Sequence, residues 1–367
     1  MPIPNRRPHA ASRVLPLVLA AGLLPSTLRA QQADSVVFKA NALEVSFAGR
    51  VQTQFNTTTV ESEPSTEIAL RRVRLEATVR LNDWITAKIQ PEYAGSRVSV
   101  RDAYVRFAFD PALALVAGQA HRPFGTILPT SSTRILPIER GVRIRGLPNA
   151  REEQNLVAEL GYADRDVGIQ LTGEPEWAPL GLSYALGVFN GPARGDAREL
   201  NTYQLAARVA ARPLDLLKLG ASWSRRDFVV PDPANEDVLR TRGGQAWGLD
   251  AEYGRYAPGL HLLAEAAWGD YDPAEDVTFT GVQGWLGYRT GALTSKLTGV
   301  EPVLRVSTGD VDGEPTRLAV DGGTLVTPGL NLYFGGLNRI MLNYDLWSPD
   351  GDGGREGSFK IQFQAAF

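Results

Sequence analysis

The sequence predicts an all-β fold: a transmembrane antiparallel β-barrel of about 16 strands, with a third extracellular loop folded inward. Two observations predict this fold class. Apolar and polar side chains alternate along residues 358–367, and the final residue is an aromatic one, Phe367. The first thirty residues carry the features of an export signal. An alternating terminal strand in an exported chain is typical of bacterial outer-membrane barrels.

Residues 1–30 have the composition of a cleaved signal peptide. Arg6, Arg7 and Arg13 form a charged start, residues 14–24 are apolar, and Ala30 is a small residue at a cleavage point. The apolar stretch is too short to remain as a membrane-spanning helix, which needs roughly 20 apolar residues. We therefore expect export to the bacterial outer membrane, removal of residues 1–30, and one barrel domain over residues 31–367.

The composition of the exported part excludes several classes of protein. Residues 1–30 hold four of the 38 Lys and Arg residues and no acid, so 34 basic residues remain against 41 acidic ones, a formal net charge of −7. Nucleic-acid binding usually requires a basic surplus, and we expect no nucleic-acid partner. The chain has no cysteine, which excludes disulfides and thiolate metal sites. We expect neither a metal nor a cofactor.

Alternating segments of about ten residues, the length of a tilted membrane-spanning strand, recur along the whole chain. They lie at residues 44–55, 67–80, 84–92, 99–109, 112–118, 165–173, 181–190, 202–212, 215–224, 245–254, 260–269, 277–289, 300–308, 322–334, 337–347 and 358–367. Most even-numbered connections are short, as at 81–83, 110–111, 212–215 and 335–336, whereas odd-numbered ones include 56–66, 119–164, 225–244 and 347–357. Short periplasmic turns and long outer loops alternate in this way in outer-membrane barrels, so both chain ends are expected on the periplasmic side.

The alternation also predicts which side chains face the lumen, because successive residues of a strand point to opposite faces. A soluble sandwich alternates as well, but here one face carries charges in strand after strand. The charged residues are Arg50, Arg72, Arg74, Glu76, Arg80, Lys88, Glu92, Asp102, Arg106, Arg208, Lys218, Glu265, Arg305, Arg339 and Lys360. A wide barrel keeps a polar lumen, so we expect this charged face inside. Trp84, Trp223, Trp268 and Trp347 lie near predicted strand ends, where aromatic girdles occur.

The third outer connection has the strongest local charge. Residues 121–151 contain a single acid, Glu139, and six arginines, namely Arg122, Arg134, Arg140, Arg143, Arg145 and Arg151. A loop of this length is usually functional or disordered, and we expect it to enter the lumen. Basic charge at a constriction selects anions, and the arginine fork donates paired hydrogen bonds to oxyanions. Neutral donors are available from Thr130, Ser131, Ser132 and Tyr104, while Asp102 and Glu139 are placed to orient the arginines.

The arginines also have a less specific interpretation. Arginines of a surface loop are often solvated or paired with acids. The chain contains 33 arginines and only five lysines, so part of the loop's enrichment is compositional.

A set of short motifs in a fixed order extends this interpretation. Residues 70–76 are LRRVRLE, residues 100–107 are VRDAYVRF, and residues 118–125 are GQAHRPFG. The pairs Ser131-Ser132 and Glu139-Arg140 follow. In order and spacing these motifs resemble the phosphate-selective porin O and P family, most clearly over residues 44–145.

The resemblance implies a sixteen-stranded, usually trimeric outer-membrane porin that passes phosphate, polyphosphate or other anions through an arginine-lined lumen. Arg71 and Arg72 fall where the family places paired constriction arginines, and Asp102 falls in the Asp-Ala-Tyr motif. Phosphate-specific members use lysines at the central site, whereas this chain has His121 and Arg122 at the loop start and Lys88 nearby. The resemblance therefore leaves phosphate selectivity open.

These arguments predict an outer-membrane porin for the passive diffusion of anions. The predicted anion path comprises Arg71, Arg72, Arg74, Lys88, Asp102, Tyr104, Arg106, Arg122, Ser131, Ser132, Arg134, Arg140, Arg143 and Arg145. The expected partners are phosphate or similar oxyanions, outer-membrane lipid and lipopolysaccharide, the barrel assembly machinery through the C-terminal strand, and further copies of the chain in a homotrimer.

Three alternatives remain. A general porin would lack phosphate selectivity. A non-conducting barrel would act as an adhesin or scaffold, with acids such as Asp232, Asp350 and Asp352 in its large loops holding cations. An enzyme is disfavoured, because residues 31–367 contain only two histidines, His121 and His261, and no Gly-x-Ser-x-Gly elbow.

Overall fold

The computed structural model describes residues 36–40, 43–60, 63–95, 98–142, 150–191, 202–232, 234–313, 322–351 and 354–367. The predicted signal peptide, Arg143 and Arg145 lie outside these residues.

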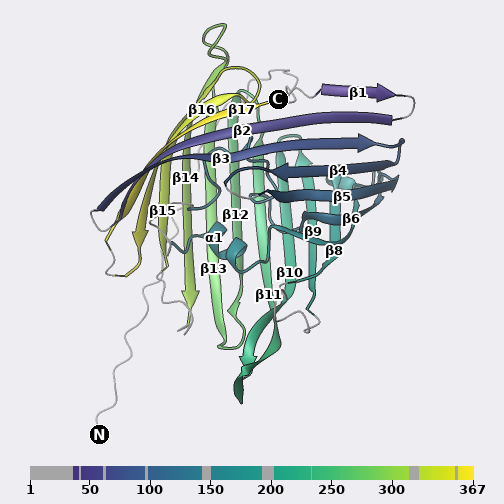
Figure 1. Cartoon of the computed structure of the whole chain (residues 1–367), viewed down its shortest axis with the longest axis vertical. Coiled ribbons are helices and arrows are strands. Elements are labelled where there is room, and N and C mark those ends of the chain that lie inside the picture. Colours follow the sequence, from purple (N-terminus) through teal and green to yellow (C-terminus); the bar gives the residue numbers. More distant parts are fainter. Residues whose placement is uncertain are drawn as a thin grey trace. The chain divides into compact units, whose positions relative to one another are not determined.

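Sixteen antiparallel strands form a closed barrel, as the alternation predicts (Figure 1). They are β2 (Leu43–Val60), β3 (Glu63–Arg80), β4 (Ile85–Glu92), β5 (Ser99–Asp110), β6 (Leu113–His121), β7 (Arg165–Gly173), β8 (Ser183–Phe189), β9 (Gln204–Leu214), β10 (Leu217–Asp232), β11 (Asn235–Gly254), β12 (Gly259–Asp272), β13 (Val277–Arg289), β14 (Gly299–Asp312), β15 (Gly323–Tyr333), β16 (Arg339–Pro349) and β17 (Glu356–Ala366). Each strand pairs with the next in sequence, and β17 pairs with β2 to close the barrel. Closure gives each of the sixteen described strands a paired neighbour on both sides, which a membrane-spanning sheet requires.

A seventeenth strand, β1 (Val36–Ala40), was not expected from the sequence. It pairs with Leu43–Phe47 of β2. β17 pairs with the same edge of β2 further along that strand, from Arg50 to Thr59. Between the two, the backbone of Phe367 exchanges hydrogen bonds of 2.7 and 3.1 Å with Gly49. The terminal aromatic residue therefore ends the closing strand, and β1 continues the same edge of β2.

Two predicted outer loops are wrong. Residues 56–60 belong to β2 and residues 63–66 to β3, while residues 225–232 belong to β10 and residues 235–244 to β11. Beyond the hydrocarbon layer of the membrane, both faces of a hairpin are in contact with water. Apolar and polar side chains therefore need not alternate there, even though the backbones of the two strands remain paired. The loop between β6 and β7, hereafter L3 (residues 122–164), is a long connection as expected.

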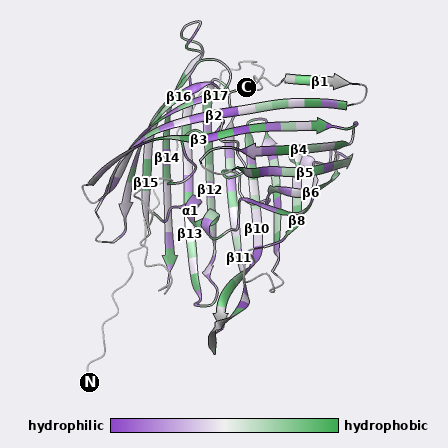
Figure 2. Ribbon diagram, viewed as in Figure 1, coloured by the Kyte–Doolittle hydropathy of each residue, from purple (hydrophilic) through white to green (hydrophobic). Residues whose placement is uncertain are grey.

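The outward face is apolar and carries two groups of aromatic side chains. Trp84, Phe107 and Phe109 pack together beside the short turns, with ring centroids 5.9 to 6.5 Å apart. Trp223, Trp247 and Trp268 lie opposite one another on β10, β11 and β12. Figure 2 shows the alternation of hydrophilic and hydrophobic residues along the strands. Aromatic girdles of this kind mark the two interfaces of the membrane.

The inner face is not uniformly charged, which corrects the expectation of a charged face turned inward throughout. In β13 the buried inward row includes Val277, Phe279 and Trp285. Trp347 of β16 is also buried, beside Leu325, rather than placed in a girdle. These side chains can face inward because L3 covers them.

Candidate functional site

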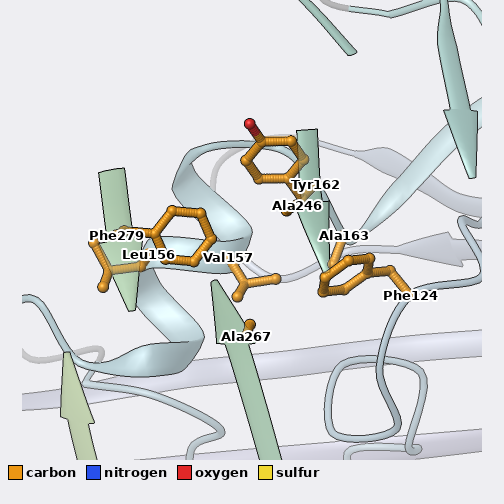
Figure 3. Close-up of a cluster of buried hydrophobic side chains, with 8 residues drawn as sticks. All are labelled: Phe124, Leu156, Val157, Tyr162, Ala163, Ala246, Ala267 and Phe279. Atoms are coloured by element: carbon orange, nitrogen blue, oxygen red, sulfur yellow. The ribbon is translucent and has the colours of Figure 1, made fainter. Parts of the chain in front are cut away.

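L3 packs against apolar side chains of the inner wall. Its short helix α1 (Glu153–Glu159) packs Leu156 and Val157 against Phe279 and Ala267 of β13 and β12 (Figure 3). A second cluster joins Ile127, Ile135 and Leu136 of L3 to Leu263, Trp285 and Val303 of the wall. Burial of this apolar surface positions L3 on one side of the lumen.

In the part of the chain that the structure describes, no helix has the length and apolar composition needed to span a membrane.

A row of inward polar side chains also clamps the backbone of L3. Each donates a hydrogen bond to a carbonyl oxygen of the loop, at distances of 2.7 to 3.1 Å: Gln52 to Ser132, Gln364 to Thr133, Arg339 to Ile135, Asn331 to Leu136 and Arg305 to Glu139. The donors come from β2, β17, β16, β15 and β14, which are neighbours around the barrel. Buried backbone carbonyls need such partners, so the polar wall fixes the path of the loop.

Glu139 is the ionic anchor of L3. Its carboxylate accepts hydrogen bonds from Arg71 Nε at 2.6 Å and from Arg72 Nη2 at 2.7 Å. Burial of Glu139 disfavours its charge, but Arg71 and Arg72 outweigh burial and hold its pKa well below the usual range. The two arginines predicted at the constriction therefore bind the loop to β3.

A β-bulge explains how two consecutive residues of β3 reach the same carboxylate. Gln52 pairs with Arg72 and Thr53 with Leu70, which leaves Arg71 as the extra residue. A bulge of this kind re-aims a side chain that regular alternation would turn to the other face. Strand parity alone would have pointed Arg71 towards lipid.

A buried carboxyl pair lies at the start of α1. Glu153 is fully buried and hydrogen-bonds to Glu265 of β12, while its Oε1 atom has no hydrogen-bond partner in the described part of the chain. Burial, together with the charges of Glu265 and Glu152, raises the pKa of Glu153 well above its usual value. A proton on this pair therefore favours the docked loop.

The raised pKa predicts that docking of α1 weakens as pH rises. The cost of ionising Glu153 is absent below the ordinary carboxyl pKa, grows as pH rises above that pKa, and becomes constant once pH exceeds the raised pKa. We expect current noise from L3 motion in single channels to increase from pH 5 towards pH 9, and Glu153→Gln to remove this increase. Glu159→Gln, an exposed position on the same helix, is the matched control; equal behaviour of the two variants would contradict the assignment.

Three chambers within the lumen are lined by side chains of both L3 and the strands. The outer chamber, of about 380 Å³, lies by the far ends of β4 and β5 and includes Glu92 and Arg101. The inner chamber, of about 530 Å³, reaches the C-terminal end of the chain at Phe367. A side chamber of about 550 Å³ adjoins β9 to β11. The outer and inner chambers share four lining residues, Arg74, His121, Arg140 and Arg165, which we call the junction.

The inner chamber has a strongly cationic lining. Seven cationic residues line it, Arg50, Arg74, Lys88, Arg106, Arg134, Arg140 and Arg165, against two carboxylates, Glu76 and Asp102. Tyr104, Ser131 and Ser132 also line it. Most of the sequence-predicted set therefore lies around one chamber, with some members on the strands and others on L3.

Several of these cations are neutralised by direct ion pairs. Arg74 binds both oxygens of Glu92 at 2.8 and 2.9 Å. Lys88 lies 3.0 Å from Glu76 and 3.5 Å from Asp102. Asp102 also accepts a 2.5 Å hydrogen bond from Arg165 Nε, as expected for an acid that orients an arginine.

Four cations of the inner chamber, Arg50, Arg106, Arg134 and Arg140, have no carboxylate within 4.0 Å among the described residues. Arg50 donates hydrogen bonds of 2.9 and 3.0 Å to the hydroxyls of Ser131 and Ser132. Arg134 lies over the ring of Tyr256, 5.7 Å from its centroid. Arg140 donates to the carbonyls of Ile127 and Thr130, and Arg106 is exposed to the chamber.

The remaining predicted positions have other surroundings. Arg122 is buried and donates to Gln204 and to the carbonyl of Ala163, and it lines the side chamber. Arg50 and Arg165 were not among the predicted path residues, although Arg50 was assigned to the inward face. Arg165 begins β7 directly after L3, and the sequence offered no signal that it would meet Asp102.

A closed sixteen-stranded barrel whose third outer loop narrows a charged lumen is an outer-membrane porin. The chain belongs to the phosphate-selective porin O and P family, whose model matches residues 45–246. The fold and the family are those of a channel in the bacterial outer membrane.

Solved structures show the same fold at low sequence identity. An anion-selective porin from Comamonas acidovorans aligns with a TM-score of 0.60 and 12% identity over 89% of this chain and 100% of its own. OmpF of Salmonella typhi, in complex with daunomycin, gives 0.59 and 12% over 90% and 100%. OmpT of Vibrio cholerae gives 0.55 and 12% over 90% and 100%. Among curated proteins, no sequence matches significantly.

Proposed function

We propose that this porin is a passive channel for anions, including oxyanions such as phosphate, and that the junction and the inner chamber are its selective region. The observation that carries the proposal is the group of four cations without a carboxylate partner, Arg50, Arg106, Arg134 and Arg140. An ion-paired arginine presents little net charge to a passing solute. These four side chains have no paired carboxylate in the described part of the chain and so present their full positive charge. Arg71 and Arg72 contribute by holding L3 in place.

Crowding of positive charge supports an anion path at the junction. Burial and the nearby charges of Arg72 and Arg74 lower the pKa of Arg140 well below the ordinary arginine value. A passing anion relieves this repulsion, and the arginines replace part of the hydration that the anion loses in the narrow region. Carboxylates paired with Arg74 and Arg165 moderate the attraction, so that an anion can also leave.

The test is the reversal potential of the purified protein in a planar bilayer across a KCl gradient, followed by titration with phosphate. We expect anion preference, with phosphate reducing the chloride current. Anion preference without block by phosphate would identify a general anion pore. Cation preference would overturn the proposal, and absence of conductance would favour a closed scaffold.

We also propose how the channel reaches its working state. Residues 1–30 are removed on export, and the assembly machinery recognises strand β17, whose end is held to Gly49. The barrels then associate as trimers in a membrane containing lipopolysaccharide. In-vitro-folded OmpT of Vibrio cholerae, a structural relative, is described in a trimer form, which supports this assembly.

A further inference from the structure

The junction contains one side chain that is not an arginine. Arg74, Arg140 and Arg165 can only donate hydrogen bonds, because a guanidinium has no acceptor. His121, the fourth residue, can also accept one. It lines the side chamber as well, and so contacts each of the three chambers described above.

The carboxylates around the junction are already engaged. Glu92 uses both oxygens on Arg74, and Asp102 is shared by Arg165 and Lys88. Glu139 is held by Arg71 and Arg72, and Asp164 lies near Arg101 and Arg165. A solute at the junction therefore meets many donors, while the nearby acids are occupied by cations.

His121 is positioned but chemically unused. It ends β6, and its backbone carbonyl accepts a 3.0 Å hydrogen bond from Gln170 Nε2. Its Nδ1 atom is buried without a hydrogen-bond partner, and the ring makes no hydrogen bond to any other described residue. Buried polar atoms are normally satisfied, and exceptions in a native structure require an explanation. A neutral imidazole offers one donor and one acceptor nitrogen.

We propose that His121 accepts a hydrogen bond from an oxyanion that still carries a proton, and so makes the junction distinguish protonated from fully ionised tetrahedral anions. The arginines bind the charged oxygens of either kind. Only a hydroxyl of the anion, as in hydrogen phosphate or hydrogen arsenate, donates a hydrogen to the imidazole. Sulfate and selenate have the same shape and charge but no proton to donate. This inference rests on the proposed anion channel and adds the basis of its discrimination.

Block of the chloride current at pH 8 by four anions, phosphate, arsenate, sulfate and selenate, tests the proposal in planar bilayers. At this pH all four are mainly dianions, and only the first two carry a proton. We expect phosphate and arsenate to block at about fivefold lower concentration than sulfate and selenate, the effect of one ordinary hydrogen bond. His121→Phe should bring all four to the same concentration, and His121→Gln, which keeps an acceptor oxygen, should retain part of the difference.

His261→Gln is the matched control, because His261 pairs with Glu252 and lines none of the three chambers. Equal block by all four anions in the unmodified channel would overturn the role of His121, as would a difference that survives in His121→Phe. If the unmodified channel showed no preference for chloride over potassium, that result would instead contradict the proposed function. A far-ultraviolet circular dichroism spectrum of His121→Phe that matches that of the unmodified protein separates loss of recognition from failure to fold.

Discussion

Replacing Arg50, Arg106 and Arg134 together by glutamate is expected to turn anion preference into cation preference. The lining of the inner chamber would change from seven cations and two carboxylates to four cations and five carboxylates. Of the four remaining cations, Arg74, Lys88 and Arg165 are already paired with acids. The reversal potential in a KCl gradient should therefore change sign. None of the three replaced side chains contributes to the anchor of L3 at Glu139.

A matched control replaces Arg212, Arg240 and Lys296 by glutamate. It changes the total charge equally, but none of these residues lines a chamber. We expect its selectivity to stay that of the unmodified channel. If both triple variants shifted the reversal potential alike, selectivity would depend on the overall charge of the protein rather than on the chamber wall.

The second large effect is expected from Glu139→Gln, which removes the anchor between L3 and β3. Loss of one partner from a buried ion pair costs about 3 to 5 kcal/mol, because the other charge remains buried without compensation. Here two arginines, Arg71 and Arg72, would lose their partner. We expect L3 to move away from the wall, so that single channels become noisier and conduct more. The thermal unfolding temperature should fall as well.

Glu92→Gln provides a closely matched control for this change. This substitution also removes a carboxylate from the lining of the outer chamber and leaves an arginine, Arg74, without that carboxylate. The Arg74–Glu92 ion pair, however, joins two strands and does not hold L3. We expect Glu92→Gln to lower stability without raising current noise. Equal noise in both variants would assign the effect to charge in the chamber and not to release of the loop.

The strands could be predicted because a membrane-spanning barrel imposes one requirement on every strand: an apolar outward row. That requirement places residues such as Leu75, Val79 and Phe107 at alternate positions, and sixteen predicted segments correspond to sixteen strands. The prediction failed where the requirement ends. The hairpins around 56–66 and 225–244 have no lipid to face, and the inward row of β13 faces a loop instead of water.

The candidate site could be predicted only as a list of residue types. The sequence identified an arginine-rich third loop and an arginine-bearing β3, and both occur at the chambers. It could not assign partners, because Glu139 lies more than sixty residues from Arg71 and Arg72 along the chain. Arg71 reaches the lumen only through a bulge, which depends on pairing between two strands.

The sequence by itself determined the class of fold and its wall, since alternation is a local property that each strand carries in its own residues. The tertiary structure alone decided which charges are free to act. Arg72 and Arg74 are buried against carboxylates, whereas Arg50, Arg106, Arg134 and Arg140 are not, although all are arginines on the lumen side. The reason is that the net charge offered to a solute depends on distances between side chains of different strands and of L3, and only closure of the barrel fixes those distances.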